Sequence, residues 1–228
     1  MSESPLRYKR ATRESFHESW PADWPRRENL VIQHNVTVEQ YEAFRALLER
    51  KAGEREIEAY LDRNREALSL SVVMFSTGHH ASWIFPKRQI RPPSGTRSGL
   101  IPDYLMAGAN SDGVQWFVLE LKGADKHAFA KAGSHVLLSS DANRGICQLV
   151  NYIDSSSRDQ AYLRDGLELS GFREARGILL IGTDLETEDA QVRDFKNAWN
   201  RINARVQIRS YSGFLRNVEQ KLKSFRKL

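Results

Sequence analysis

The sequence predicts an α/β domain with a mixed central β-sheet flanked by helices. The first observation is that strand-like segments over 101–107 and 114–122 enclose a run of turn-forming residues, which indicates a β-hairpin. The second is that apolar strand-like runs and amphipathic helical runs alternate from there to residue 228. A hairpin followed by alternating strands and helices is typical of an α/β domain whose sheet contains both antiparallel and parallel pairs.

An irregular arm and two helices precede the predicted sheet. Residues 1 to about 36 mix charges, prolines and tryptophans of the exposed type without a sustained period, and they contain one short strand-like run. A helix is expected over 37–50, because Thr37 and Gln40 stand at the spacing of a capping box. A second helix begins after residue 53, with an apolar stripe of Ile57, Tyr60 and Leu61.

Strands are expected on both sides of a basic, turn-rich loop. Residues 69–78 are strand-like in their β-branched content, and the aromatic and basic segment that starts at Ala81 ends in a loop near residue 100. The hairpin follows, and its two strands are joined by GANSDG, which contains Asp112-Gly113.

The second half of the chain is expected to alternate between helices and strands. Residues 125–140 predict a loop with some helix. The later elements are a helix over 144–156, a buried strand over 175–184, a helix over 188–204, a strand over 206–211 and a basic helix over 214–228.

Composition limits the class of protein. With 228 residues, of which 40% are hydrophobic, the chain can bury the core of one main domain. The formal net charge of +5 favours a polyanionic partner, because clustered Lys and Arg release counterions from phosphates.

There is no long apolar run and the first residues are polar, so we expect a cytoplasmic protein that does not bind membranes. The single cysteine, Cys147, lies in an apolar run and is expected to be buried.

Three charged residues converge at one end of the predicted hairpin. If the turn is centred between Ser111 and Asp112, residues whose numbers sum to 223 lie opposite each other. Asp103 then faces Glu120 across the strands at about 5 Å. The side chain of Lys122 leaves the same face of the sheet about 7 Å further along.

These residue types favour phosphodiester hydrolysis. Two carboxylates so close repel each other unless one takes a proton or a divalent cation lies between them, and their oxygen atoms suit Mg²⁺ or Mn²⁺. Such a cation polarises a phosphoryl oxygen, while a nearby lysine orients water or stabilises the developing charge. In the other interpretation, Asp103 caps a turn and Glu120 and Lys122 are solvated on an exposed strand. The apolar neighbours of Glu120 favour a central strand instead.

The arrangement resembles a known nuclease signature. Pro102-Asp103, a hairpin and Glu120-Leu121-Lys122 are similar to the motif of the PD-(D/E)XK superfamily. Within that superfamily the chain resembles the Shedu antiphage nuclease family from about residue 54 onward, through YLDRN, IPD, VLELK, QLVNY, GILLIG and VQIRSYSGFL. The resemblance implies a restriction-endonuclease-like core over 51–228, preceded by an accessory arm and helix over 1–50. It also implies cleavage of DNA with Mg²⁺ or Mn²⁺ in defence against phage, by a homo-oligomer such as a dimer or tetramer.

The resemblance implies a further acidic residue on the helix before the sheet. Members of the superfamily often carry a glutamate there, and this helix offers Glu54, Glu56 and Glu58. Glu54 lies nearest the apolar stripe at about 100° per residue and is therefore the expected metal or base residue, with the other two closer to solvent. The alternative is that all three only complement the helix dipole.

Two residues of the later helix are also candidates for the site. Gln148 and Tyr152 have the QxxxY spacing of several branches of the superfamily and share one helix face, where they could hold the metal-bound water or a phosphate. Alternatively, they are a surface amide and a half-buried tyrosine. In either case, the expected packing stripe consists of Ile146, Leu149, Val150 and Ile153.

Basic and aromatic residues around the hairpin are candidates for DNA contacts. Trp83 and Phe85 could stack on bases, although aromatic residues in such a strand more often belong to the core. The basic candidates are Lys87, Arg88, Arg91 and Arg97 before the hairpin, and Lys126 and Lys131 after it.

Two other functions remain open from the sequence. One is a non-catalytic nucleic-acid-binding or assembly protein that keeps the fold. The other is a nuclease that acts on RNA. The intact set of Asp103, Glu120 and Lys122 favours a catalytic site.

Overall fold

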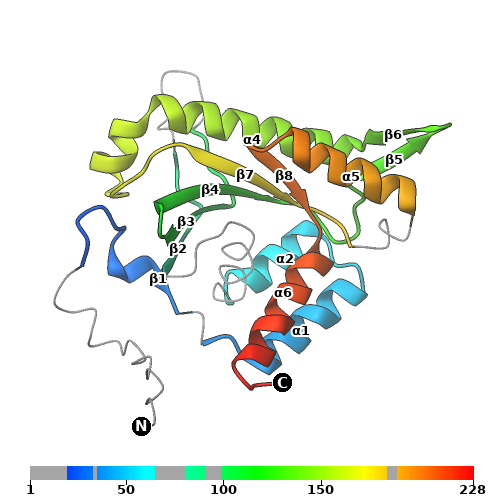
Figure 1. Cartoon of the computed structure of the whole chain (residues 1–228), viewed down its shortest axis with the longest axis horizontal. Coiled ribbons are helices and arrows are strands. Elements are labelled where there is room, and N and C mark those ends of the chain that lie inside the picture. Colours follow the sequence, from blue (N-terminus) through cyan, green and yellow to red (C-terminus); the bar gives the residue numbers. More distant parts are fainter. Residues whose placement is uncertain (1–19, 33–34, 65–80, 91–98, 184–188) are drawn as a thin grey trace, which may run out of the picture.

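A six-stranded mixed sheet forms the centre of the protein, which confirms the predicted α/β class. The computed structural model describes residues 20–32, 35–64, 81–90, 99–183 and 189–228. In this part of the chain the strand order is β1-β2-β3-β4-β7-β8 (Figure 1). The pairs from β1 to β4 are antiparallel, and those from β4 to β8 are parallel. The strands are β1 (Leu30–Val31), β2 (Ala81–Pro86), β3 (Tyr104–Asn110), β4 (Gly113–Leu121), β7 (Ala175–Leu180) and β8 (Val206–Arg209).

The β3–β4 hairpin has the predicted register. Tyr104 pairs with Leu119 and Asn110 pairs with Gly113, so paired residue numbers sum to 223. The turn is tight because Gly113 adopts a φ of 101°, which glycine tolerates, and because the Asn110 side chain accepts a hydrogen bond from the Asp112 backbone N–H at 2.8 Å.

Two helices allow β7 and β8 to extend the sheet in parallel. Helix α4 (Ser140–Arg158) lies between β4 and β7 in the chain, and α5 (Ala190–Ile202) lies between β7 and β8. Side chains cap both helices, since Ser139 accepts a hydrogen bond from the N–H of Ala142 and Asp189 accepts from the N–H groups of the first turn of α5. The two helices cover the same face of the sheet (Figure 1).

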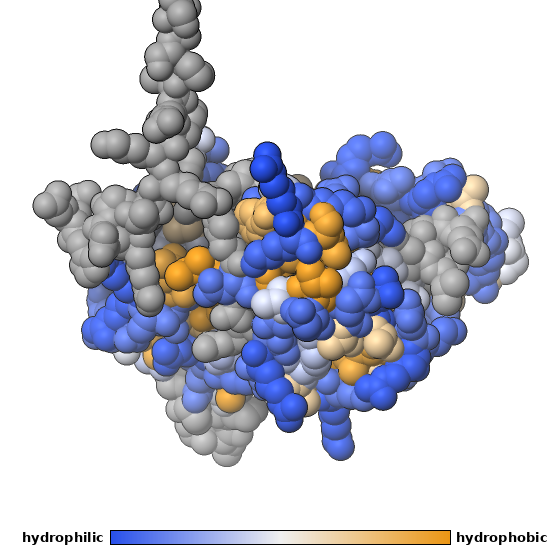
Figure 2. Space-filling view, turned by 90° about the horizontal axis from the view of Figure 1, so that it is seen from below, coloured by the Kyte–Doolittle hydropathy of each residue, from blue (hydrophilic) through white to orange (hydrophobic). Residues whose placement is uncertain are grey.

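Three helices form the opposite layer. They are α1 (Val38–Glu49), α2 (Glu54–Leu61) and α6 (Tyr211–Ser224). The predicted capping box of α1 is present, with both reciprocal bonds between Thr37 and Gln40. Ile57 and Leu61 are fully buried, as the apolar stripe of α2 predicts. Seen from the side of α1 and α6, the surface is mostly hydrophilic with small hydrophobic patches, as expected for amphipathic helices (Figure 2).

Tryptophans of the N-terminal segment belong to the core, which corrects their assignment as exposed. Trp20 and Trp24 are half-buried and meet Trp83 edge to face, with ring centroids 6.1 and 5.2 Å from its ring. Trp83 itself is fully buried, and Phe85 is buried and stacks on Trp116. Neither Trp83 nor Phe85 is therefore available for base stacking, and the core interpretation is confirmed.

The prediction of a loop with some helix over 125–140 is wrong. Strands β5 (Phe129–Ala132) and β6 (His135–Leu138) form a separate two-stranded hairpin. Gly133, with a φ of 60°, permits the reversal between them. The alanine-rich sequence conceals the strands, because only Phe129 and Val136 carry large buried side chains.

The packing face of α4 is also different from the predicted one. Leu149 is buried as expected, but Val150 is 51% exposed and Cys147 is exposed rather than buried. The run GICQLV is apolar on more than one side of the helix, and only the side with Gly145, Leu149 and Tyr152 faces the sheet.

Several shorter features complete the described part of the chain. A 3-10 turn, η1, spans Arg27–Asn29, and a π-helical turn, η3, spans Tyr162–Gly166. The strand predicted over 69–78 and the basic residues Arg91 and Arg97 lie outside the described residues. No helix in the described ranges is long and apolar enough to cross a membrane.

Candidate active site

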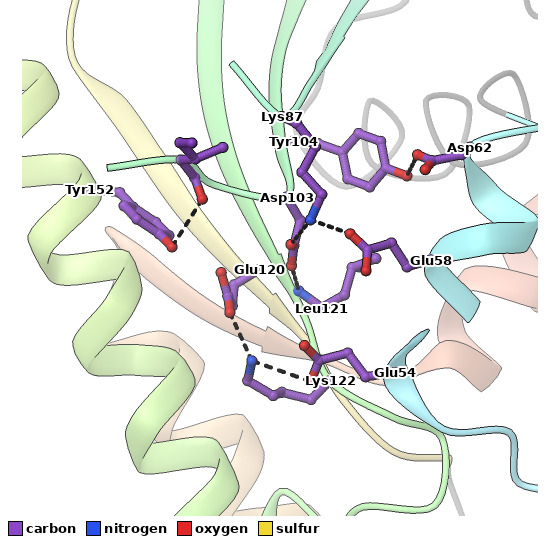
Figure 3. A network of polar contacts seen from close by, with 11 residues as sticks. Glu54, Glu58, Asp62, Lys87, Asp103, Tyr104, Glu120, Leu121, Lys122 and Tyr152 are labelled. Atoms are coloured by element: carbon purple, nitrogen blue, oxygen red, sulfur yellow. Dashed lines mark hydrogen bonds and ion pairs between the residues drawn. The ribbon is translucent and has the colours of Figure 1, made fainter. Parts of the chain in front are cut away.

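The three charged residues of the predicted motif meet where β4 ends and β3 begins. Glu120 is the penultimate residue of β4, Lys122 follows this strand, and Asp103 directly precedes β3. Helices α2 and α4 lie on either side (Figure 3). This end of the sheet is the carboxyl end of the parallel strands β4 and β7, where α/β proteins commonly bind ligands.

Asp103 is held by both its side chain and its main chain. Its Oδ2 accepts a hydrogen bond from the Leu121 backbone N–H at 2.7 Å, and its Oδ1 lies 2.6 Å from the Lys87 ammonium. Its carbonyl oxygen accepts a hydrogen bond from the Lys87 N–H at 3.0 Å. The bond to Leu121 keeps Asp103 beside the end of β4, as predicted, and the two contacts with Lys87 tie Asp103 to the end of β2.

Glu120 and Lys122 form a buried pair. The two residues are only 3% and 7% exposed, and Lys122 Nζ donates to Glu120 Oε1 at 2.7 Å. Burial raises the pKa of Glu120 from its ordinary 4.5 to about 7; the negative charge of Asp103 adds to this, and Lys122 partly offsets it. Burial disfavours the Lys122 ammonium, but its bond to Glu120 raises its pKa overall. The interpretation of both as solvated strand residues is therefore wrong.

Helix α2 contributes two glutamates to the site. Glu54 Oε2 lies 3.4 Å from Lys122 Nζ, so the structure brings the predicted helix glutamate to the motif. Glu58, expected to point further toward solvent, pairs with Lys87, and its side chain is less exposed than that of Glu54, at 25% against 45%. The spacing of four residues, which places both on one helix face, is the signal that could have identified Glu58.

The backbone after β4 is fixed from several elements. The N–H of Lys122 donates to the Leu180 carbonyl at 2.9 Å, and the buried hydroxyl of Tyr211 donates to the Lys122 carbonyl at 2.7 Å. The next residue is Gly123, where a Cβ would lie only 3.1 Å from the Glu54 nitrogen. Glycine therefore lets the end of β4 approach the start of α2, which places Glu54 near Lys122.

Tyr152 and Gln148 lie on the α4 side of the site. The Tyr152 hydroxyl donates to the Ile101 carbonyl at 3.3 Å, and the residue is buried on the packing face of α4. Burial raises the pKa of Tyr152 to about 12, and the negative charges of Glu120 and Asp103 add to this. The Oε1 of Gln148 is buried and accepts no hydrogen bond from the described residues, which leaves one polar atom beside the site unsatisfied.

The predicted DNA-contacting residues that the structure describes do not form one cluster. Lys87 belongs to the site itself, and Arg88 follows it on the surface. Lys126 pairs with Asp125 at 3.4 Å, shortly after β4. Lys131 is on β5 and pairs with Asp189 at the start of α5. Of the described basic candidates, the structure thus brings only Lys87 into contact with the motif.

The donor set fits a divalent cation held by two carboxylates. The described residues include no group of three or more His, Cys, Asp or Glu side chains placed to hold a metal. Mg²⁺ in phosphate-processing sites commonly takes one or two protein carboxylates and completes its shell with water and phosphate oxygens. Asp103 and Glu120 match this pattern. Burial is the main cause of the raised pKa of Glu120 and the charge of Asp103 adds to it, and a cation between the two carboxylates would relieve their repulsion. Glu54, which was expected to be a metal or base residue, forms an ion pair with Lys122 instead of lying with Asp103 and Glu120 as a third carboxylate ligand.

Comparison with known proteins adds no relative. Neither a scan against models of protein families nor a search of curated proteins finds a match to this chain.

Proposed function

We propose that the protein is a metal-dependent nuclease that hydrolyses phosphodiester bonds of DNA. The observation that supports this most strongly is the direct contact of Glu120 with Lys122, both buried, next to Asp103 at one end of the sheet. Taking an ammonium and a carboxylate out of water costs roughly several kcal/mol for each ion, and their mutual attraction often does not offset this cost. Stability of the fold alone is therefore a weak reason for burying this pair. Active sites are where such arrangements are found.

Each residue has a role in the proposed reaction. Asp103 and Glu120 would hold Mg²⁺ or Mn²⁺, which when bound polarises the phosphoryl oxygen and acidifies a water molecule. Lys122 is placed to orient the attacking water and to stabilise the negative charge that develops on phosphorus-bound oxygens. Glu54 keeps the Lys122 side chain in place from α2. Tyr152 and Gln148 would bind a phosphate oxygen or the attacking water from α4.

The biological part of the proposal comes from the resemblance to the Shedu family. The motifs that carry it are Pro102-Asp103 with Glu120-Leu121-Lys122, together with the later helix and strands. On this basis we propose a PD-(D/E)XK core, action in the cytoplasm against phage DNA and assembly into a dimer or tetramer. These assignments rest on analogy of fold and motif.

A cleavage assay tests the proposal. Purified protein would be incubated with supercoiled plasmid, linear DNA and RNA in Mg²⁺ or Mn²⁺, with EDTA as the metal-free arm. The site variants are Glu120→Gln and Lys122→Met, and the matched controls are Glu174→Gln and Lys131→Met, whose side chains form exposed ion pairs away from the site. Lys223→Met, which removes an exposed ion pair with Glu219 and is not a DNA-contact candidate, is a further control. We expect cutting that needs metal, persists in Glu174→Gln and Lys223→Met and is lost in the site variants, whereas Lys131→Met would weaken cutting only if Lys131 contacts DNA.

Other outcomes of this assay select the alternatives. DNA binding without cleavage, equal in all variants and indifferent to EDTA, would show a binding or assembly protein. Cleavage of RNA alone would replace the DNA substrate. Cleavage unaffected by both site variants would place the active site elsewhere.

A further inference from the structure

Lys87 is the residue at the site whose place the sequence did not suggest. It directly follows β2, and its ammonium contacts two carboxylates, Oδ1 of Asp103 at 2.6 Å and an oxygen of Glu58 (Figure 3). The Asp103 side chain is only 14% exposed, whereas that of Lys87 is 45% exposed. The ammonium therefore approaches a largely buried carboxylate from the solvent side.

The backbone of Lys87 is shaped for this contact. Its φ is +48°, a left-handed conformation that is unfavourable for a residue with a side chain. Its N–H donates to the carbonyl of Asp103, so main chain and side chain both bind the same residue.

The side chains of the site carry more negative than positive charge. Glu54, Glu58, Asp103 and Glu120 supply four carboxylates, and Lys87 and Lys122 supply two ammonium groups. With every group ionised, these six side chains carry a formal charge of two negative units (four minus two). One divalent cation neutralises that excess.

Lys87 holds the carboxylate that a cation would need. Oδ2 of Asp103 already accepts the Leu121 N–H, and a metal that bound through Oδ1 would take the atom that Lys87 contacts. A divalent cation and an ammonium do not share so small a space, because their charges repel each other. Glu58 offers the displaced ammonium a second partner.

We propose that Lys87 is an exchangeable internal cation of the site: it holds Asp103 in the metal-free protein and moves off Oδ1, remaining with Glu58, when a divalent cation binds. This inference rests on the proposed function, because it takes Asp103 to be a metal ligand. It adds a residue and a competition that the nuclease motif does not contain. The released ammonium would then remain with Glu58 on the solvent side of the site, from which the phosphate of a nucleic acid would approach.

Binding of Mn²⁺ without nucleic acid tests the exchange. Isothermal titration at fixed pH and ionic strength would compare the wild type with Lys87→Met, which keeps the length of the side chain but removes its charge. Lys131→Met is the matched control, because Lys131 also forms an ion pair with an aspartate and is equally exposed, at 44% against 45%. Circular dichroism would verify that each variant is folded.

We expect Lys87→Met to bind Mn²⁺ about three- to tenfold more tightly, the effect of removing a competing ion pair of about 1 kcal/mol. Lys131→Met should bind like the wild type, and Asp103→Asn should lose most of the affinity. Equal or weaker binding by Lys87→Met, with Asp103→Asn still defective, would overturn the exchange and leave the metal site intact. Failure of every protein to bind Mn²⁺, or binding indifferent to Asp103→Asn, would overturn the metal site as well.

Discussion

The Asp103 carboxylate accepts a hydrogen bond from the backbone N–H of Leu121, with 2.7 Å between Oδ2 and the nitrogen. The two residues lie 18 positions apart, and the bond joins the segment before β3 to the end of β4. It continues the hairpin by one step beyond the pair Tyr104–Leu119, which places Asp103 beside Glu120. One carboxylate thus has a structural contact through Oδ2 and a contact with Lys87 through Oδ1.

The two functions of Asp103 can be separated by substitution. Asp103→Asn keeps an oxygen that can accept from Leu121 but removes the charge, so we expect cleavage to be lost while stability changes by less than about 1 kcal/mol. Asp103→Ala removes both the charge and the accepting oxygen. We expect it to lower the free energy of unfolding by a further amount of about 1–3 kcal/mol, the cost of an unsatisfied buried donor, because the Leu121 N–H is left without an acceptor. Urea denaturation and plasmid nicking measure the two effects. Equal stability of both variants would argue against the structural bond.

A double-mutant cycle measures the coupling of Glu120 and Lys122. At pH 8, Lys122→Met leaves a buried carboxylate without its ammonium, and we expect a loss of roughly 2–4 kcal/mol of unfolding free energy. Adding Glu120→Gln should restore about 1–3 kcal/mol of that loss, because the uncompensated charge disappears. Chemical denaturation of the wild type, both single variants and the double variant provides the cycle. Strictly additive losses would contradict a direct interaction.

The raised pKa of Glu120 predicts a pH dependence of stability. The folded carboxyl has a pKa of about 7, above its ordinary 4.5, so between these values the folded state holds a proton that the unfolded state has released. The stability that Glu120 contributes to the free energy of unfolding is therefore fully present below pH 4.5. It is lost as the pH rises through 7, and the loss is at most about 3 kcal/mol. Glu120→Gln should show a flatter curve between pH 5 and 8. Parallel curves for the two proteins would contradict the raised pKa.

The buried hydroxyl of Tyr211 is expected to support Lys122. Tyr211→Phe leaves the Lys122 carbonyl without this donor. We expect the free energy of unfolding to fall by about 1–3 kcal/mol and cleavage to be slower. Tyr60→Phe is the matched control, because the Tyr60 hydroxyl also donates to a backbone carbonyl, that of Gln40, away from the motif. It should lose stability but cleave at the normal rate once folded. Equal cleavage by both folded variants would show that the Tyr211 bond is only structural.

Local patterns were sufficient for the central part of the fold and for the core of the candidate site. The hairpin register follows from the position of its turn, because each strand alternates its side chains with a period of two. Asp103, Glu120 and Lys122 are close to one another along the hairpin, so their proximity needed no other element. It was harder to choose among the glutamates of α2. Helical periodicity ranks them by their distance from the apolar stripe, but it does not show which element packs against that stripe.

Features without a strong local signal escaped prediction. The β5–β6 hairpin is short and alanine-rich, so its two strands lack the alternation that identifies a strand. Cys147 and Val150 lie in an apolar helical run, and their exposure depends on which side of α4 meets the sheet. Trp20 and Trp24 stand in a proline-rich, charged segment and are half-buried only because Trp83 lies beneath them.

The sequence by itself determined the α/β class, the hairpin with its register, the capping box of α1 and the alignment of one lysine with two carboxylates, because all of these depend on residues close in the chain or paired through one turn. Only the tertiary structure decided that Lys87, from the end of β2, lies between Asp103 and Glu58. Glu58 and Lys87 are 29 positions apart and belong to different layers. Their meeting depends on how α2 packs against the sheet, and no local periodicity encodes the distance between two packed elements.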